Sequence, residues 1–297
     1  MSQLSSLAKS FMLSKKCLLT LLIGFGIALV STAATNPTED LKAPEDYNTI
    51  IEKGRLRVGV QNNAKPFFYY EKGQPTGFNY EFLQLLLTQA EFMNQGNTIR
   101  LITDIEADTY SDVPLLLKSK NSRGDYEVDI VIDGLTFVDD EVPGVVYSTP
   151  YISDFGYSVV ASSRTGIVSV DDLVGKKIGI LKGDPDVKAY AERRLNKSQL
   201  VELSDASING QRTWIKNAID KKIVDAVVYD YPFAVAEIEG TDLVFAISKL
   251  PDTHLRYTIG VRKTSPLLLK NLNSAINKVK NTNEYYDLLK KYFFWQD

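Results

Sequence analysis

Cysteine and histidine are almost missing from this sequence, which has one of each, Cys17 and His254. A single cysteine cannot close a disulfide within the chain, so the fold must be stabilised by packing. One histidine argues against a histidine-based catalytic triad and, together with one cysteine, against the common zinc sites. Carboxylate chemistry is the catalytic option that stays open, and we predict neither a metal ion nor a cofactor.

The apolar run near the N-terminus is too short to be a membrane span. Residues 17–30 carry no charge but fall below the roughly 20 apolar residues that cross a bilayer. Lysines precede this run and small residues follow it, which is the layout of a signal peptide. We expect residues 1–34 to be removed by cleavage after about Ala33 or Ala34, leaving 35–48 as a polar tether. The alternative is an uncleaved anchor.

Positive charge is also in short supply. The formal net charge is −3, and loss of the signal peptide would remove three lysines and no acid, leaving −6. A nucleic-acid partner is therefore not expected. The length that remains exceeds one typical domain of roughly 100–200 residues, which predicts two lobes or one large one.

Strand and helix patterns alternate along the rest of the chain. The first half is predicted to hold strands at 55–60, 98–103 and 129–132, with helices at 79–92 and 113–118. The second half repeats the pattern, with strands at 156–161, 177–181, 200–203, 225–229, 243–247 and 257–261 and helices at 185–195, 208–220, 266–279 and 284–294. Two sets of such units predict an α/β protein with two parallel or mixed sheets.

Polar segments follow the predicted strands. They are residues 61–63, 133–136 and 182–184, together with Asp230. In open α/β sheets, ligands bind beyond the carboxyl ends of the strands, so these segments predict a binding site. Each segment alone could be a solvated loop, and the prediction rests on their joint pattern.

A series of short motifs, in order, resembles family 3 of the bacterial extracellular solute-binding proteins. The matching stretches are 56–60, 66–67, 73, 76–78, 128–131, 134–136, 147–151, 172–180 and 224–227. The resemblance runs from about Thr49 to the C-terminus. It implies a type II periplasmic-binding-protein fold of two lobes, each a mixed sheet flanked by helices, joined by a two-segment hinge.

The lobes implied by this resemblance are discontinuous in sequence. Lobe 1 is expected to comprise 49–155 plus 254–297 and lobe 2 to comprise 156–253, with crossovers near 153–157 and 253–257. Ligand contacts from both lobes would form together only in a closed state, which the ligand would therefore populate.

The function implied is that of a periplasmic receptor. It would deliver a small polar, amino-acid-like or cationic solute to an ABC transporter permease in the inner membrane, and we expect a monomer without enzymatic activity. Two alternatives stay open. One is an enzyme on the same scaffold, similar to cyclohexadienyl dehydratase, with Glu141 or Asp184 as general acid. The other is an orphan sensory binding domain.

The sequence departs from the family at the positions that bind a ligand carboxylate. The position of the family's carboxylate-binding arginine reads Glu141, and its Gly-Thr or Gly-Ser pair reads Gly183-Asp184. The family's acidic partner for the ligand ammonium is retained as Asp230, and Asp133 adds another acid. We therefore predict a cationic or amine-rich ligand, since a ligand carboxylate would meet like charges.

Other interpretations of these residues are also open. Asp184 could simply N-cap the helix that begins at Pro185, and Glu141 could be solvated. An aromatic ring such as Phe67, Tyr70 or Tyr110 could contact a cationic ligand or pack in a core. The full set of candidate ligand-binding residues is Gln61, Asn63, Phe67, Tyr70, Asp133, Gly134, Thr136, Glu141, Gly183, Asp184 and Asp230.

Overall fold

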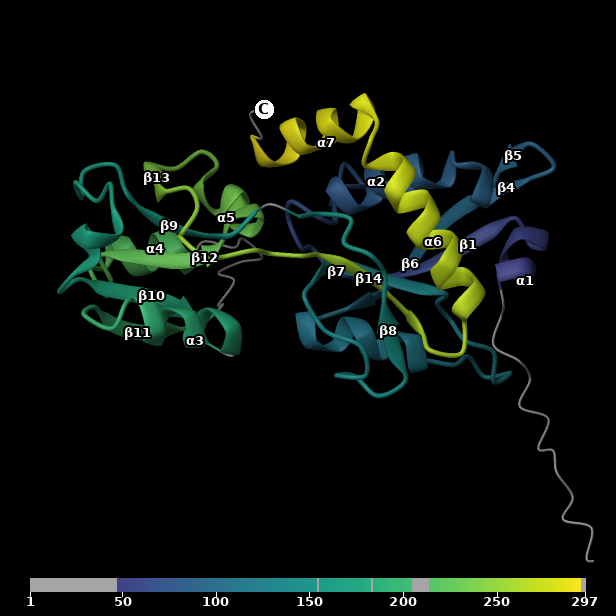
Figure 1. Ribbon diagram of the computed structural model, residues 1–297, viewed down its shortest axis with the longest axis horizontal. Helices are drawn as coiled ribbons and strands as arrows, with labels where there is room; N and C mark the ends of the chain where they lie inside the picture. The colour runs from purple at the N-terminus through teal and green to yellow at the C-terminus, as the bar shows by residue number, and fades with distance from the viewer. Residues whose placement is uncertain (1–46, 154, 183, 205–213, 295–297) are drawn as a thin grey trace, which may run out of the picture. The chain divides into compact units, whose positions relative to one another are not determined.

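A computed structural model describes residues 47–153, 155–182, 184–204 and 214–294; the predicted signal peptide lies outside them. Within this part of the chain, two five-stranded sheets carry the fold, and helices flank each of them (Figure 1). The strand orders are β6-β1-β7-β14-β8 and β11-β10-β12-β9-β13. No helix in the described ranges is long and apolar enough to cross a membrane.

The first sheet is mixed. Its strands are β1 (Arg55–Gln61), β6 (Arg100–Ala107), β7 (Ile130–Leu135), β8 (Val145–Tyr147) and β14 (Thr258–Arg262). Strand β1 runs parallel to β6 and β7, whereas β14 is antiparallel to both of its neighbours, β7 and β8. The carboxyl ends of β1, β6 and β7 therefore share one edge of the sheet.

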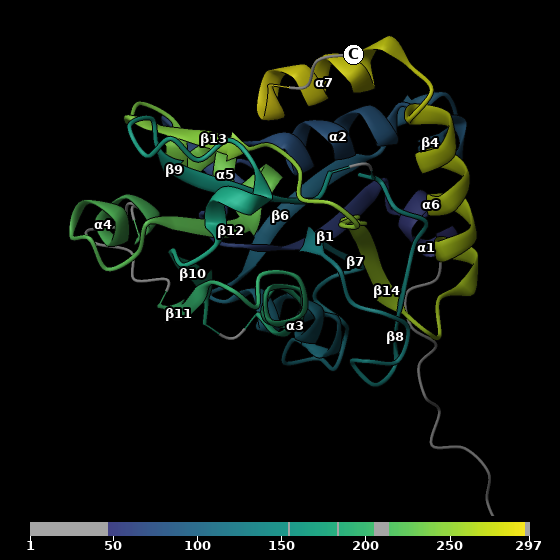
Figure 2. The ribbon, with the colours of Figure 1, turned by 60° about the vertical axis from the view of Figure 1, so that its left-hand side comes forward.

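Strand β7 carries apolar side chains on both faces of this sheet, so both faces have to be covered by other elements. Ile130 and Ile132 enter the larger core, which also contains side chains of α2 (Phe78–Leu87), α6 (Pro266–Val279) and α7 (Asn283–Phe293). Val131 points to the opposite face, where it packs with residues of the 3₁₀ helix η2 (Tyr110–Lys118). Figure 2 shows α2 lying beneath α7, and α6 running along the edge of the same layer.

The second sheet is built in the same way. Its strands are β9 (Tyr157–Ser162), β10 (Lys177–Leu181), β11 (Gln199–Leu203), β12 (Ala226–Asp230) and β13 (Leu243–Ile247). Strand β10 is parallel to β11 and β12, while β9 is antiparallel to β12 and β13. Its flanking helices are η3 (Val170–Leu173), α3 (Pro185–Arg194), α4 (Trp214–Asp220) and α5 (Tyr231–Ile238).

The chain passes between the two sheets twice, after β8 and again after β13. The two connections pair with each other: Tyr257 N donates to Ile152 O at 3.1 Å and Leu255 N donates to Phe155 O at 2.9 Å. The prediction of a two-lobed α/β fold with a two-segment hinge is confirmed. The exact lobe boundaries, 49–155 plus 254–297 and 156–253, stay a prediction.

Aromatic side chains fill the space beside this hinge. Phe67, which is fully buried, packs against Phe233 of α5 with ring centroids 4.6 Å apart and against Tyr257 at 5.5 Å. Gly134 leaves room for this cluster, because a Cβ at that position would lie 2.6 Å from a ring carbon of Phe233. A larger residue at 134 would therefore push the ring of α5 away from β7.

The predicted strands and helices recur in the described part, most of them displaced by one or two residues. The predicted helix 79–92 is the main exception: α2 ends at Leu87, and a separate 3₁₀ turn, η1, covers Ala90–Phe92. Gln89 has an extended backbone, which turns the buried Phe92 toward the core. Helix α5 was not predicted, and residues 208–213 of the predicted helix 208–220 lie outside the described residues.

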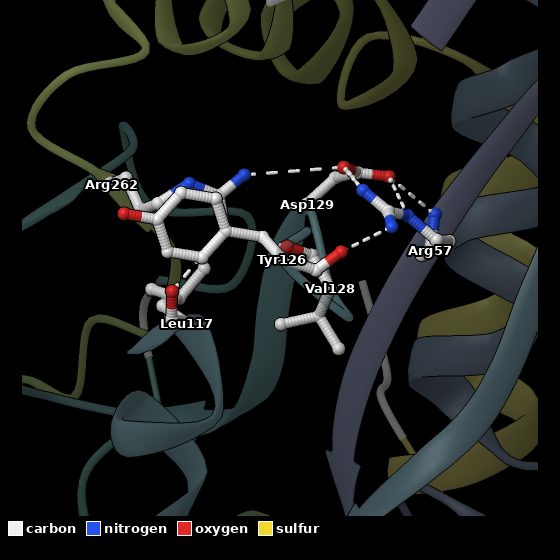
Figure 3. A network of polar contacts seen from close by, with 6 residues as sticks. All are labelled: Arg57, Leu117, Tyr126, Val128, Asp129 and Arg262. Carbon is white, nitrogen blue, oxygen red and sulfur yellow. Dashed lines mark hydrogen bonds and ion pairs between the residues drawn. The ribbon is translucent and has the colours of Figure 1, made fainter. Parts of the chain in front are cut away.

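A buried ionic network joins the amino-terminal ends of β1 and β7 to the carboxyl end of β14 (Figure 3). The Asp129 carboxylate, which is fully buried, accepts from Arg57 Nε at 3.2 Å and from the second terminal nitrogen of Arg57 at 2.6 Å. A terminal nitrogen of Arg262 lies 4.0 Å from the same carboxylate, and its guanidinium covers the Tyr126 ring at 4.3 Å. This network ties three strands together at the edge opposite the strand ends at Gln61 and Gly134.

We predict that Asp129→Asn lowers the free energy of unfolding by roughly 3–5 kcal/mol, because it removes the charge of the buried carboxylate that Arg57 and Arg262 face. Urea unfolding monitored by circular dichroism measures this loss. Glu202→Gln is the control, since Glu202 pairs with Lys188 at the surface and should change the unfolding midpoint little. Equal losses from the two variants would contradict a structural role for the buried network.

Candidate ligand-binding site

A cavity of about 510 Å³ lies where the carboxyl ends of strands from both sheets meet. Lobe 1 contributes Gln61 at the end of β1 and Gly134 near the end of β7. Lobe 2 contributes Leu181 at the end of β10 and Asp230 at the end of β12. A volume of this size suits a small solute. The cavity lies at the sheet edges where ligands of open α/β sheets bind.

Six of the predicted candidates line this cavity. They are Gln61, Gly134, Thr136, Glu141, Asp184 and Asp230. Gly183, between two segments of the described chain, lies outside the described residues. The other four candidates do not line the cavity.

Asp133 is buried within β7, because that strand continues to Leu135 and does not end at residue 132 as predicted. Phe67 lies in the aromatic cluster beside the hinge. Tyr70 is about half exposed and donates to Glu106 Oε1 at 2.7 Å. Asn63 is exposed in the turn after β1, with a positive φ of 51°. The structure therefore separates these side chains from the cavity.

The cavity wall is strongly acidic. Five carboxylates line it: Asp108 and Glu141 from lobe 1, and Asp184, Asp186 and Asp230 from lobe 2. Lys182 is the one basic residue among the described residues that line the same cavity. Asp108 and Asp186 were not predicted. Asp108 directly follows β6, and Asp186 lies in the first turn of α3. The charge balance favours a positively charged occupant.

Asp230 is the most perturbed of these acids. Its Oδ2 accepts from the Tyr257 hydroxyl at 2.8 Å. Burial, which is the largest cause, and the negative charges of Asp184 and Asp186 together raise the pKa of Asp230 to about 7, although the hydrogen bond from Tyr257 acts the other way. A cation beside Asp230 would favour its ionised form, so the site is prepared to exchange a proton for a positive ligand.

Asp184 both caps a helix and lines the cavity. Its Oδ1 accepts from Val187 N at 3.0 Å, as the N-cap prediction for the helix beginning at Pro185 requires. Burial also raises its pKa. Glu141 is exposed and its Oε2 accepts from Val138 N at 3.0 Å, so this carboxylate is held at the cavity wall by its own loop.

Aromatic rings form another part of the wall. Tyr110 stacks on Phe137 with ring centroids 5.2 Å apart and an interplanar angle of 16°, and Tyr229 and Phe233 line the cavity from lobe 2. Of these four, only Tyr110 was considered from the sequence. Tyr229 could have been found, because it directly precedes Asp230 at the end of a predicted strand.

No group of three or more His, Cys, Asp or Glu side chains within the described ranges is placed to hold a metal ion.

Comparison with known proteins decides the family. The model of the bacterial extracellular solute-binding proteins, family 3, matches residues 117–294. The chain belongs to this family. It is therefore a solute-binding protein, and the resemblance predicted from the order of motifs is confirmed.

Individual relatives of this family 3 protein are distant but cover most of the chain. The L-cystine-binding protein TcyJ of Escherichia coli K12 is 23% identical, over 90% of this chain and 93% of its own length. The arginine-binding extracellular protein ArtP of Bacillus subtilis is 25% identical, over 81% and 87%.

Solved structures of related proteins share the two-lobed fold. An ancestral cationic amino acid solute-binding protein has a TM-score of 0.62 and 24% identity, covering 83% of this chain and 99% of its own. The arginine-bound protein AbpA of Streptococcus pneumoniae has a TM-score of 0.59 and 22% identity, covering 83% and 98%.

We predict that the contribution of Asp230 to the stability of the protein without ligand falls as pH rises from about 4 to about 7. The folded state holds a proton on Asp230 that the unfolded chain, with an aspartate pKa of about 3.9, releases. Stability from this proton is complete below pH 4 and is lost as pH rises through the folded pKa. Asp230→Asn removes the titrating group, so its melting temperature should exceed that of the wild type at pH 8 and approach it at pH 5.

Scanning calorimetry from pH 4 to pH 8 measures this difference. Asp225→Asn is a control on the same strand segment, outside the cavity, where the Asp225 carboxylate accepts from Lys177 N at 2.8 Å. A gap between wild type and Asp230→Asn that stays constant with pH would contradict the assignment.

Proposed function

We propose that this family 3 protein is the receptor of an ABC-type uptake system and that its ligand is a small cationic amine. The observation that carries the proposal is the composition of the cavity, where five carboxylates face one lysine. A ligand with net positive charge would neutralise these groups, and a ligand with net negative charge would add to their repulsion.

The magnitude of the charge effect supports this choice. Two unit charges 4 Å apart interact by about 4 kcal/mol at an effective dielectric constant of 20. One poorly compensated carboxylate on the ligand would therefore reduce affinity by roughly a factor of 10³. Glu141 lines the cavity and stands at the position where the resemblance to the family implies a carboxylate-binding arginine. A ligand carboxylate that an arginine would attract is repelled by this glutamate.

The aromatic wall suits the same ligand class. An ammonium or guanidinium group near Tyr110, Phe137 or Tyr229 would meet the negative face of a ring while remaining close to the carboxylates. The names of ArtP and of the ancestral cationic amino acid-binding protein indicate that related proteins take cationic ligands.

Partner and location follow from the same proposal. We infer delivery to a permease in the inner membrane, export to the periplasm with cleavage after about Ala33 or Ala34, and a monomeric receptor. Intact-mass measurement of the exported chain determines the cleavage site.

An enzymatic function is the second candidate, because burial brings the pKa of Asp230 to about 7, where a carboxyl group can act as general acid. One relative is a membrane-bound lytic murein transglycosylase of Pseudomonas fluorescens, 22% identical over 85% of this chain and 49% of its own length. Against dehydration of prephenate-like acids stands the acidic wall, which repels such substrates. Turnover assays with these acids separate enzyme from receptor.

We predict that basic amino acids and polyamines raise the melting temperature, since a ligand that binds only the folded state stabilises it by mass action. Glutamate should give no shift. Glu141→Arg should weaken cation binding by roughly tenfold or more, because it replaces an attractive charge with a repulsive one. The screen uses thermal melting, followed by titration calorimetry of the best cation.

Glu71→Arg is the matched control, because Glu71 is an exposed acid of β2 (Tyr69–Glu71) outside the cavity and the substitution changes the net charge equally. Its affinity for the cation should stay within about twofold of the wild type, since surface charges act weakly at a distance. Stabilisation by glutamate without stabilisation by any cation would contradict the proposal.

A further inference from the structure

The hydroxyl of Tyr110 accepts a hydrogen bond from a main-chain N–H at the cavity wall. Thr136 N donates to Tyr110 Oη at 3.1 Å, and the hydroxyls of the two residues lie 3.2 Å apart. Both residues line the cavity, Tyr110 from η2 and Thr136 from the segment directly after β7. The Thr136 N–H, directly after β7, is therefore already hydrogen-bonded to the Tyr110 hydroxyl at this wall.

Main-chain N–H groups and hydroxyls are the groups with which a protein without a nearby arginine can hold a carboxylate. In this cavity, the Thr136 N–H and hydroxyl both contact Tyr110. The remaining basic residue of the described wall, Lys182, is exposed and shares its lobe with three carboxylates. A ligand carboxylate at Thr136 would have to displace Tyr110, and one at Lys182 would meet those acids.

We propose that the Tyr110 hydroxyl takes the place of a ligand anion at Thr136, so that the cavity selects amines that lack a carboxylate over the corresponding amino acids. This inference rests on the proposed function, because it concerns the chemical class of the cationic solute. It makes Tyr110 a specificity-determining residue of the binding site.

Packing against a neighbouring ring holds the Tyr110 side chain in place. Its ring is stacked on Phe137, which holds the hydroxyl toward Thr136. Burial raises the pKa of Tyr110, and the charges of Asp133 and Asp230 raise it further, so the hydroxyl stays protonated and neutral. A neutral hydroxyl satisfies the Thr136 N–H without adding a sixth negative charge to the wall.

The acids of the two lobes favour a ligand with positive charge at both of its ends. Asp108 and Glu141 lie on the lobe 1 wall, and Asp184, Asp186 and Asp230 lie on the lobe 2 wall. A ligand with a cationic group at each end could meet both walls at once, whereas a carboxylate at either end would face acids. Diamines and guanidinoalkylamines have this pattern of charge.

Pairs of ligands that differ only in the carboxylate test the inference. Titration calorimetry at pH 7.5 compares agmatine with arginine, and cadaverine with lysine. The wild type should bind each amine roughly 10- to 10³-fold more tightly than its amino acid, the upper figure being the effect of one poorly compensated carboxylate. Tyr110→Phe frees the Thr136 N–H and should reduce this ratio several-fold, chiefly by improving binding of the amino acid.

Tyr70→Phe is the matched control, because it removes a hydroxyl that bonds Glu106 in the same lobe but outside the cavity. Its ratio should equal that of the wild type. Thr136→Ala serves as a second variant that keeps Tyr110 and its ring in place; because the Thr136 N–H stays occupied, the preference for the amine should persist.

The outcomes separate this inference from the proposed function. If the wild type binds arginine and lysine as tightly as agmatine and cadaverine, the selection against carboxylates is wrong while cation binding stands. If Tyr110→Phe leaves the ratio unchanged, Tyr110 does not determine it. If none of the four cations binds, the proposed function itself is wrong.

Discussion

The hydrogen bond from the Tyr257 hydroxyl to Asp230 connects the binding cavity to the hinge. Tyr257 lies in the segment that returns the chain to lobe 1 and pairs with Ile152 of the outgoing segment. Asp230 ends β12 of lobe 2 and directly precedes α5. Because one side chain belongs to the hinge and the other to the cavity, a change of charge on Asp230 acts directly on a hydrogen bond of the hinge.

The raised pKa of Asp230 links the acidic wall to ligand binding. Burial and the neighbouring charges of Asp184 and Asp186 disfavour the ionised form of Asp230, and a proton or a bound cation offsets that cost. Without ligand, a proton on Asp230 takes this role, and in the proposed complex the cationic ligand would replace it. Closure of the two lobes would bring the acids of both walls nearer, so a cation would favour the closed state more than the open one.

The architecture was predictable from the sequence because it depends on patterns that span many residues. The apolar runs that became β7, β10 and β12, and the repeated order of strands and helices, required no knowledge of distant contacts. Local capping was also predictable, since Asp184 followed by Pro185 specifies a helix start within three residues. Gln61, Thr136 and Asp230 were found because strand ends meet at one edge of a sheet.

The remaining details of the cavity depend on how far each strand continues and on contacts between residues far apart in sequence. Asp133 was expected at the cavity, but β7 extends past it and buries it in the sheet. Phe67 was expected near a ligand, but it packs on Phe233, which is 166 positions further along the chain. The bond between Tyr110 and Thr136 likewise depends on how η2 is placed beside β7, which no local pattern reveals.

Identification of the solute that the protein binds in its native setting tests the central claim most directly. Native mass spectrometry of the exported protein, purified without unfolding, measures the mass of the bound solute, and release under denaturing conditions allows its chemical identity and charge to be determined. The acidic cavity predicts an amine with net positive charge at pH 7. An anionic solute, or a neutral amino acid such as glutamine, as the bound species would contradict it.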